Sequence, residues 1–228
     1  MEVACRSRAG TGLDTPLLVL LPGAGMRAGD FETHGFLDDV HRTGAPIDII
    51  AVETGMACYL DDTLAVNLHS EIMRPTITAP TQRVWLAGIS AGGFGALRYA
   101  QAYPEIVEGV ILIAPFLGSA GLIADIQRAG GLSAWRPASA ETCNPQASVL
   151  AWLGDRPADP PASPTIYLGY GETDRFARAH GLLAARLPPD QCIKAPGGHD
   201  WPTWERLWSQ LLAVCPLPAR NEENTTRA

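Results

Sequence analysis

Short apolar runs alternate with longer amphipathic stretches along most of the chain. The runs are continuously apolar, without polar alternation, which is typical of strands covered on both faces. They predict strands at residues 17–21, 48–52, 83–87, 109–114, 165–168 and 192–195. The amphipathic stretches predict helices at residues 31–42, 62–73, 92–102, 122–128, 176–187 and 204–214. This alternation predicts an α/β fold with a doubly wound, mostly parallel sheet of about six strands and helices on both faces.

The spacing of these elements indicates one α/β domain over residues 1–215 and a polar tail at 216–228 that we expect to be disordered. The segment 115–164 is longer than a simple crossover requires. Two interpretations stay open for this segment. It is either an ordinary crossover helix with a long surface loop, or a small lid that carries apolar side chains over a site.

Composition narrows the classes of partner. The chain has 228 residues, 46 % of them hydrophobic, and a formal net charge of −7, which disfavours nucleic acid and anionic membranes as partners. Residues 1–14 lack the apolar core of a secretory signal, so we expect a cytoplasmic protein. The five cysteines are dispersed without a C-x-x-C pair and predict no metal site. This leaves a small molecule among the possible partners.

One motif points to nucleophilic chemistry. The sequence Gly-Ile-Ser-Ala-Gly occupies residues 88–92, directly behind a predicted strand and before a predicted helix. A serine between glycines at this spacing can sit on a turn too sharp for larger neighbours, with its hydroxyl held out at the end of the sheet. Ser90 is therefore the candidate nucleophile.

A serine hydroxyl needs a base, usually a histidine that a carboxylate holds in the useful tautomer. His199 follows the last predicted strand on a glycine-rich loop, whereas the other four histidines fall in predicted helices, where we expect surface or core-edge groups. Asp174 follows the strand at 165–168 and is the candidate acid, with Glu172 as the fallback and a helix N-cap as the competing interpretation of Asp174. The order serine, acid, histidine matches the hydrolase arrangement.

The same chemistry requires donors for an oxyanion. The backbone N–H of Ala91 lies at the predicted start of the helix behind Ser90, where the helix dipole favours negative charge. The loop after the first predicted strand, at residues 22–25, is rich in small residues and offers a second donor. We expect this donor to be the N–H of Ala24.

These residues resemble the α/β-hydrolase superfamily over nearly the whole chain. Residues 90–97 are similar to the S-x-G-G-x-G-A-L stretch of esterase-D-like carboxylesterases, and residues 197–204 are similar to their G-x-H-x-W-x-x-W end. The resemblance implies Ser90 as nucleophile, Asp174 as acid, His199 as base, Ala24 and Ala91 as oxyanion donors, and neither metal nor cofactor. Two positions depart from it: Ala91 stands where many relatives have methionine, and Pro22 stands where histidine is frequent.

The function that follows is hydrolysis of a carboxylic ester or thioester with a small to medium acyl group. Met26, Phe94, Trp135 and Trp152 are candidates for an acyl pocket, although core packing explains each of them equally well. Three alternatives stay open: a non-catalytic hydrolase-like binding protein, an acyltransferase with the same triad, and a dinucleotide-binding oxidoreductase. The last rests on a G-x-G-x-x-A stretch at 23–28, with Glu53 as the ribose-binding acid.

Overall fold

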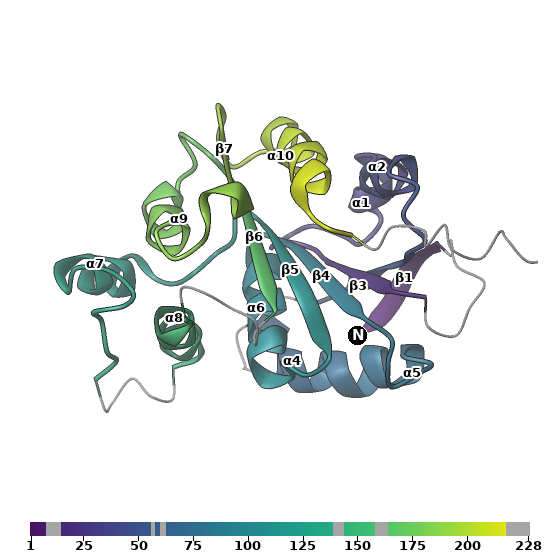
Figure 1. Ribbon diagram of the computed structural model, residues 1–228, viewed down its shortest axis with the longest axis horizontal. Coiled ribbons are helices and arrows are strands. Elements are labelled where there is room, and N and C mark those ends of the chain that lie inside the picture. The colour runs from purple at the N-terminus through teal and green to yellow at the C-terminus, as the bar shows by residue number, and fades with distance from the viewer. Residues whose placement is uncertain (8–14, 56–57, 60–62, 139–143, 158–163, 218–228) are drawn as a thin grey trace, which may run out of the picture.

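A seven-stranded sheet forms the centre of the molecule (Figure 1). The computed structural model describes residues 1–7, 15–55, 58–59, 63–138, 144–157 and 164–217. In spatial order the strands are β1 (Glu2–Ser7), β3 (Asp48–Glu53), β2 (Leu17–Leu21), β4 (Val84–Ile89), β5 (Val107–Ile113), β6 (Thr165–Gly171) and β7 (Cys192–Ala195). β1 pairs with β3 in the antiparallel sense, and every other neighbouring pair is parallel. The predicted doubly wound, mostly parallel sheet is confirmed.

Successive strand residues point to opposite faces, and each face is covered by helices. Leu18 and Leu20 of β2 belong to the hydrophobic cluster that includes α1 (Asp30–Thr33), α2 (Phe36–Arg42) and α10 (Trp201–Val214). Leu17, Val19 and Leu21 belong to the cluster on the other face. That cluster includes residues of a π-helix (Leu68–Met73), α6 (Ala91–Ala102), α7 (Ala120–Arg128), α8 (Pro145–Asp155) and α9 (Ala177–Ala184). Two apolar faces explain why the strands are continuously apolar.

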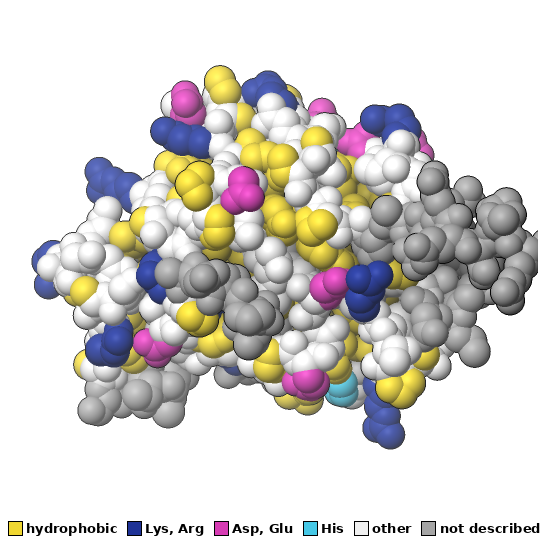
Figure 2. Space-filling view, viewed as in Figure 1, with side chains coloured by type: hydrophobic (Ala, Val, Ile, Leu, Met, Phe, Trp, Pro, Cys, Tyr) yellow, Lys and Arg dark blue, Asp and Glu magenta, His cyan; other side chains and the backbone are white. Residues whose placement is uncertain are grey.

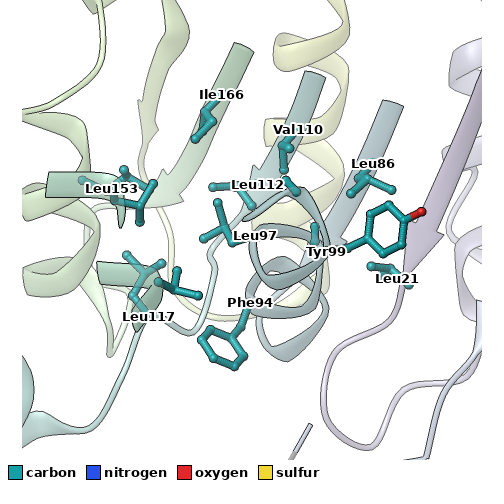
Figure 3. Packing of buried hydrophobic residues seen from close by; sticks show 14 of the residues in the cluster. Leu21, Leu86, Phe94, Leu97, Tyr99, Val110, Leu112, Leu117, Leu153 and Ile166 are labelled. Atoms are coloured by element: carbon teal, nitrogen blue, oxygen red, sulfur yellow. The ribbon is translucent and has the colours of Figure 1, made fainter. Parts of the chain in front are cut away.

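The central helix α6 supplies much of the packing on the second face. Its Leu97 lies beside Leu112 of β5, and its Tyr99 lies between Leu86 of β4 and Leu21 of β2 (Figure 3). Leu97 and Tyr99 are fully buried. Because α6 begins directly after Ser90, this packing fixes the position of the serine relative to the sheet.

The structure has one strand more than the sequence predicted. β1 contains two charged residues, Glu2 and Arg6, among its six, so it forms no continuous apolar run. It lies at the edge of the sheet, where one side of the strand has no neighbour and the demand for apolar residues is weaker. Hydrophobic periodicity alone therefore misses it.

Three helical predictions also change in detail. The helix expected at 31–42 is divided into α1 and α2 because Gly35 has a φ of 75°, which an α-helix does not allow. The helix expected at 62–73 consists of α4 (Leu64–Asn67) and the π-helix, continued by α5 (Arg74–Thr76), while residue 62 lies outside the described residues. The segment 115–164 contains α8 besides the expected α7.

α8 has clear start signals that hydrophobic periodicity did not reveal. The Asn144 side chain accepts a hydrogen bond from the Gln146 N–H at 2.9 Å, and Pro145 occupies the first turn. Residues 139–143 and 158–163 lie outside the described residues, as does the tail from 218 onwards. Within the described ranges, no helix combines the length and apolarity that a transmembrane span requires.

The parallel strands direct the candidate site residues to one edge of the sheet. The loop that contains Ala24 follows β2, Ser90 follows β4, Asp174 follows β6 and His199 follows β7. Since the carboxyl ends of parallel strands lie at the same edge, four segments far apart in sequence meet there.

We predict that Gly109→Ala destabilises this sheet. A Cβ on Gly109 of β5 would lie 2.3 Å from the ring of Trp85, which is buried in β4. Overpacking of this kind costs about 1–3 kcal/mol in the free energy of unfolding. The matched control is Gly121→Ala in α7, where a Cβ has open space and should stabilise by about 0.5–1 kcal/mol. Urea denaturation curves measure both, and equal midpoints for the two variants would contradict the packing argument.

Candidate active site

Ser90 sits on a sharp turn between β4 and α6. Its φ of 52° and ψ of −114° are strained for a residue with a side chain, and such strain costs about 1–3 kcal/mol. A Cβ on Gly88 would lie 2.3 Å from the backbone of Gly92, and a Cβ on Gly92 would lie 2.0 Å from the carbonyl oxygen of Leu21. Both positions therefore accept only glycine, which explains the spacing of the motif.

Neighbouring strands hold this turn in place. The Ser90 N–H donates to the Ile113 carbonyl at 3.0 Å, at the end of β5. The Ser90 carbonyl accepts from the N–H of Phe116 at 2.9 Å and from the N–H of Phe94 in α6 at 3.3 Å. These contacts compensate the backbone strain and orient the side chain at the carboxyl edge of the sheet.

The structure brings Ser90, His199 and Asp174 together in one hydrogen-bonded chain. His199 Nε2 lies 3.0 Å from Ser90 Oγ, and His199 Nδ1 lies 2.7 Å from Asp174 Oδ2. The side chain of Asp174 is fully buried and that of His199 is 10 % exposed. With Nδ1–H donating to the carboxylate, Nε2 carries the lone pair that accepts from the serine hydroxyl.

The environment of Asp174 keeps it ionised. Burial raises the pKa of this carboxyl, but hydrogen bonds from His199 and from the Phe176 N–H outweigh burial, so the pKa lies below its usual value. The Phe176 N–H reaches Oδ1 at 2.8 Å. The side chain of Glu172, the fallback acid, is exposed, and the carboxylate that reaches His199 is that of Asp174.

The loop that carries His199 is anchored at both ends. Asp200 caps α10 by accepting from the Thr203 N–H at 3.0 Å, and Thr203 Oγ1 accepts from the Gly198 N–H at 3.1 Å. The Gly197 carbonyl accepts from both the N–H and the hydroxyl of Thr173, at 3.0 and 2.9 Å. Thr173 immediately precedes Asp174, so the acid and the base are positioned by one network.

Two aromatic rings pack edge-to-face against the imidazole of His199. The centroid of Phe176 lies 5.2 Å from it with an interplanar angle of 90°, and that of Trp204 lies 5.1 Å away at 89°. Phe176 precedes α9 and Trp204 lies in α10, so rings from two separate segments restrict rotation of the imidazole between Asp174 and Ser90.

The loop after β2 lies directly against the serine turn. A Cβ on Gly23 would meet Ser90 Cβ at 3.3 Å and the Ile89 carbonyl oxygen at 3.2 Å. The Gly23 N–H donates to Met26 Sδ at 3.1 Å, so Met26 supports the shape of this loop. Ala24 is exposed, and among the described residues its N–H has no acceptor. Ala91 is the first residue of α6, where helical N–H groups lack an intrahelical partner.

Tyr59 is a site residue that sequence analysis missed. Its hydroxyl donates to the Pro22 carbonyl at 2.9 Å and lies 2.9 Å from Thr54 Oγ1. Burial raises the pKa of Tyr59 to about 12, so the hydroxyl stays protonated at working pH. The tyrosine lies in no recognisable motif, and only the fold brings it to the loop that precedes Ala24.

The residues that the sequence suggested for an acyl pocket or for dinucleotide binding lie in different environments from the triad. Phe94 and Trp135 are each 5 % exposed and belong to the hydrophobic core, and Trp152 is partly buried against the same core. The Glu53 carboxylate accepts from the Ala28 N–H at 2.9 Å, so it is engaged inside the protein. No group of three or more His, Cys, Asp or Glu that could hold a metal ion occurs within the described ranges.

His180 differs most from its expected surface or core-edge position. It is fully buried in α9, and its Nε2–H donates to the Pro115 carbonyl at 2.9 Å. Its Nδ1 has no partner in the described part of the chain. Burial lowers the pKa of this imidazole, and the Pro115 carbonyl and Asp174 only partly offset that effect, so His180 is neutral near pH 7.

Comparisons with known proteins agree with this arrangement. A family model described as "Serine aminopeptidase, S33" matches residues 56–150, which include the serine turn. No curated protein matches the sequence. Among solved structures, Est1E from Butyrivibrio proteoclasticus is similar with a TM-score of 0.59 at 14% identity, over 94% of this chain and 95% of that one. The chain has the α/β-hydrolase fold.

Two further solved structures have a similar fold. A ferulic acid esterase matches with a TM-score of 0.59 at 18% identity, over 88% of this chain and 85% of its own. FphF, a fluorophosphonate-binding serine hydrolase from Staphylococcus aureus, matches with a TM-score of 0.58 at 15% identity, over 88% and 83%. At these identities the likeness concerns the fold. Together with the family match it indicates an enzyme of the serine hydrolase type.

We predict that His180 makes the stability of this protein depend on pH. The pKa of its imidazole is lower in the folded protein than the usual 6.5, so below pH 6.5 the unfolded chain binds a proton that the folded protein does not. The free energy of unfolding therefore falls with falling pH, by at most about 1.4 kcal/mol per pH unit.

His180→Gln retains a donor for the Pro115 carbonyl but does not titrate. Urea denaturation at pH 7.5, 6.5 and 5.5 should show a shallower loss of stability in the variant than in the wild type. Parallel losses in the two proteins would show that His180 is not the group responsible.

Proposed function

We propose that this α/β-hydrolase cleaves carboxylic esters or thioesters of small to medium acyl size through an acyl-enzyme. The observation that carries the proposal is the continuous chain Ser90 Oγ, His199 and Asp174, with distances of 3.0 and 2.7 Å. The donors and acceptors of the two hydrogen bonds are those that a serine hydrolase needs. An acceptor nitrogen of His199 faces the serine hydroxyl, and a buried carboxylate accepts from the other ring nitrogen.

In the proposed reaction, Ser90 Oγ attacks the carbonyl carbon while His199 Nε2 takes its proton. Asp174 stays ionised and stabilises the imidazolium that forms. His199 then protonates the departing alcohol or thiol, which leaves the acyl group on Ser90. A water molecule, deprotonated by the same imidazole, attacks the acyl-enzyme and releases the acid, and the proton returns to Ser90.

The N–H groups of Ala24 and Ala91 are the proposed donors for the oxyanion. They flank the serine from the two segments that meet at Gly23 and Gly92, and their positions support a role on the substrate oxygen. Loss of one such donor typically raises the barrier by about 2.7–4 kcal/mol. The proposed roles require neither metal nor cofactor.

The similar solved structures favour an ester over other carbonyl compounds as the substrate. One neighbour is a ferulic acid esterase, and another is an S-formylglutathione hydrolase from Staphylococcus aureus, which supports the thioester alternative. Acyl transfer to an acceptor other than water would use the same residues. A purely binding role is disfavoured because the triad is complete, and dinucleotide binding is disfavoured because Glu53 is engaged by Ala28.

The proposal also includes the domain organisation, the location and the partners that the sequence predicts. We propose one domain over residues 1–215, in which the segment 115–164 is either a small lid or a long crossover, and a cytoplasmic enzyme without nucleic-acid or membrane partners. The location of α7 beside the loop that carries Asp174 supports the lid, because both contribute to one cavity.

The first prediction from this mechanism concerns the nucleophile and the base. Ser90→Ala and His199→Ala should each lower turnover of a p-nitrophenyl ester by about 10⁴- to 10⁶-fold, with unchanged circular dichroism. A fluorophosphonate probe should add to Ser90 in the wild type, as located by peptide mass mapping, and should not label Ser90→Ala.

The matched control is Ser70→Ala, which removes an exposed helical hydroxyl far along the chain from the triad. It should keep both the labelling and the turnover. Normal turnover by Ser90→Ala would overturn the mechanism.

The second prediction concerns Tyr59. Tyr59→Phe removes the hydroxyl that fixes the Pro22 carbonyl and so loosens the loop of the proposed oxyanion donor Ala24. We expect kcat to fall roughly tenfold with little change in KM, because the loss affects the transition state more than substrate binding. Tyr99→Phe is the matched control, since that hydroxyl contacts His69 at 3.1 Å and not the loop. Equal kcat values for the two variants would exclude the positioning role.

A further inference from the structure

A cavity of about 480 Å³ lies beside the triad, between α7 and the start of α9. These two helices are neighbours at one end of the molecule (Figure 1). The α7 wall is formed by small and apolar side chains, with Gln127 as its polar member, and includes Ile123 and Ala124. The opposite wall is the segment from Asp174 through Ala179.

Phe176 connects the cavity to the catalytic centre. Its ring lines the cavity and also packs edge-to-face against His199, with the centroids 5.2 Å apart. Asp174 likewise lines the cavity while its carboxylate accepts from His199. A ligand in the cavity would therefore lie against Phe176, whose ring contacts the imidazole that is hydrogen-bonded to Ser90.

Two arginines give the cavity a positive rim. Arg175 and Arg178 line it, both are exposed, and neither forms an ion pair with a carboxylate of the described residues. The guanidinium of Arg175 lies 4.9 Å from the ring centroid of Phe176, which directs the charge over the cavity wall. Basic side chains are prominent on the end of the molecule that carries α7 and α9 (Figure 2).

This charge contrasts with the rest of the protein. The chain has a net charge of −7, and some other arginines in the described ranges form ion pairs, such as Arg42 with Asp39, Arg83 with Glu108, and Arg128 with Asp125. The carboxylate of Asp174 is the acidic group among the cavity walls, and its oxygens are already taken by His199 and the Phe176 N–H. The two guanidinium groups are therefore available to an external anion.

We propose that the cavity is a substrate subsite for esters that carry a free carboxylate, which Arg175 and Arg178 bind while an apolar spacer rests on Ile123, Ala124 and Phe176. The inference rests on the proposed function and names the substrate class of that site. Guanidinium groups suit carboxylates because their planar N–H donors match the two oxygens.

The test compares charged and neutral substrates of equal size. On the acyl side the pair is p-nitrophenyl hydrogen adipate and p-nitrophenyl methyl adipate; on the alcohol side it is para-carboxyphenyl butyrate and its methyl ester. The quantity measured is the ratio of kcat/KM for the acidic ester over the neutral ester. The wild type should prefer the acidic member of one pair, and that pair identifies which side of the ester carries the carboxylate.

The Arg175→Gln/Arg178→Gln double variant should lower this ratio by about tenfold, the range expected for charge-assisted hydrogen bonds at a partly exposed site. Arg128→Gln is the matched control, because it removes a positive charge from α7 without touching the cavity, and it should keep the wild-type ratio. A ratio that is the same in all three proteins for both pairs would overturn the proposal.

Binding separates this inference from the proposed reaction. In the Ser90→Ala background, calorimetric titration with monomethyl adipate should show saturable binding that the two arginine substitutions weaken about tenfold. Absence of binding to Ser90→Ala would also overturn the subsite. If Ser90→Ala still hydrolyses the neutral esters at the wild-type rate, the proposed mechanism fails instead, and the titration alone decides the subsite.

Discussion

The close approach between the start of α6 and the end of β2 is the contact on which the site depends. No side chain fits at Gly92, because the Leu21 and Pro22 carbonyl oxygens occupy the space that a Cβ would need. This contact brings the loop after β2 against the serine turn, and the burial of α6 against the sheet maintains it. The positions of Ser90, Ala91 and the Gly23 loop are thus consequences of one backbone packing arrangement.

The second element of the site is a buried charge that is fully compensated. Asp174 is removed from solvent, which by itself disfavours ionisation, and the hydrogen bonds from His199 and Phe176 reverse that tendency. The loops of the acid and the base are further joined through Thr173 and Gly197. Because the compensation comes from the backbone and from the base itself, the geometry of the triad and the ionisation of its carboxylate are maintained together.

The sequence predicted the parts of this protein whose signals are local. Continuous apolar runs identified the strands from β2 to β7, and the glycine spacing around Ser90 identified the turn because that turn excludes side chains. β1 was missed because an edge strand need not be apolar throughout. The burial of His180 and the role of Tyr59 depend on contacts with Pro115 and Pro22, which are distant in sequence, so no local pattern reveals them.

Phe176 has a consequence for how this enzyme can diverge. Its N–H donates to the Asp174 carboxylate and its ring packs against the His199 imidazole, so this wall of the cavity is coupled to the proposed catalytic residues. The facing wall, formed by Ile123 and Ala124 of α7, shapes the same cavity, and α7 carries none of the three residues Ser90, Asp174 and His199. Substitutions on α7 can therefore alter which ligands fit while the catalytic centre stays intact. New specificities are therefore expected to arise first on this helix, which carries none of the residues of the triad.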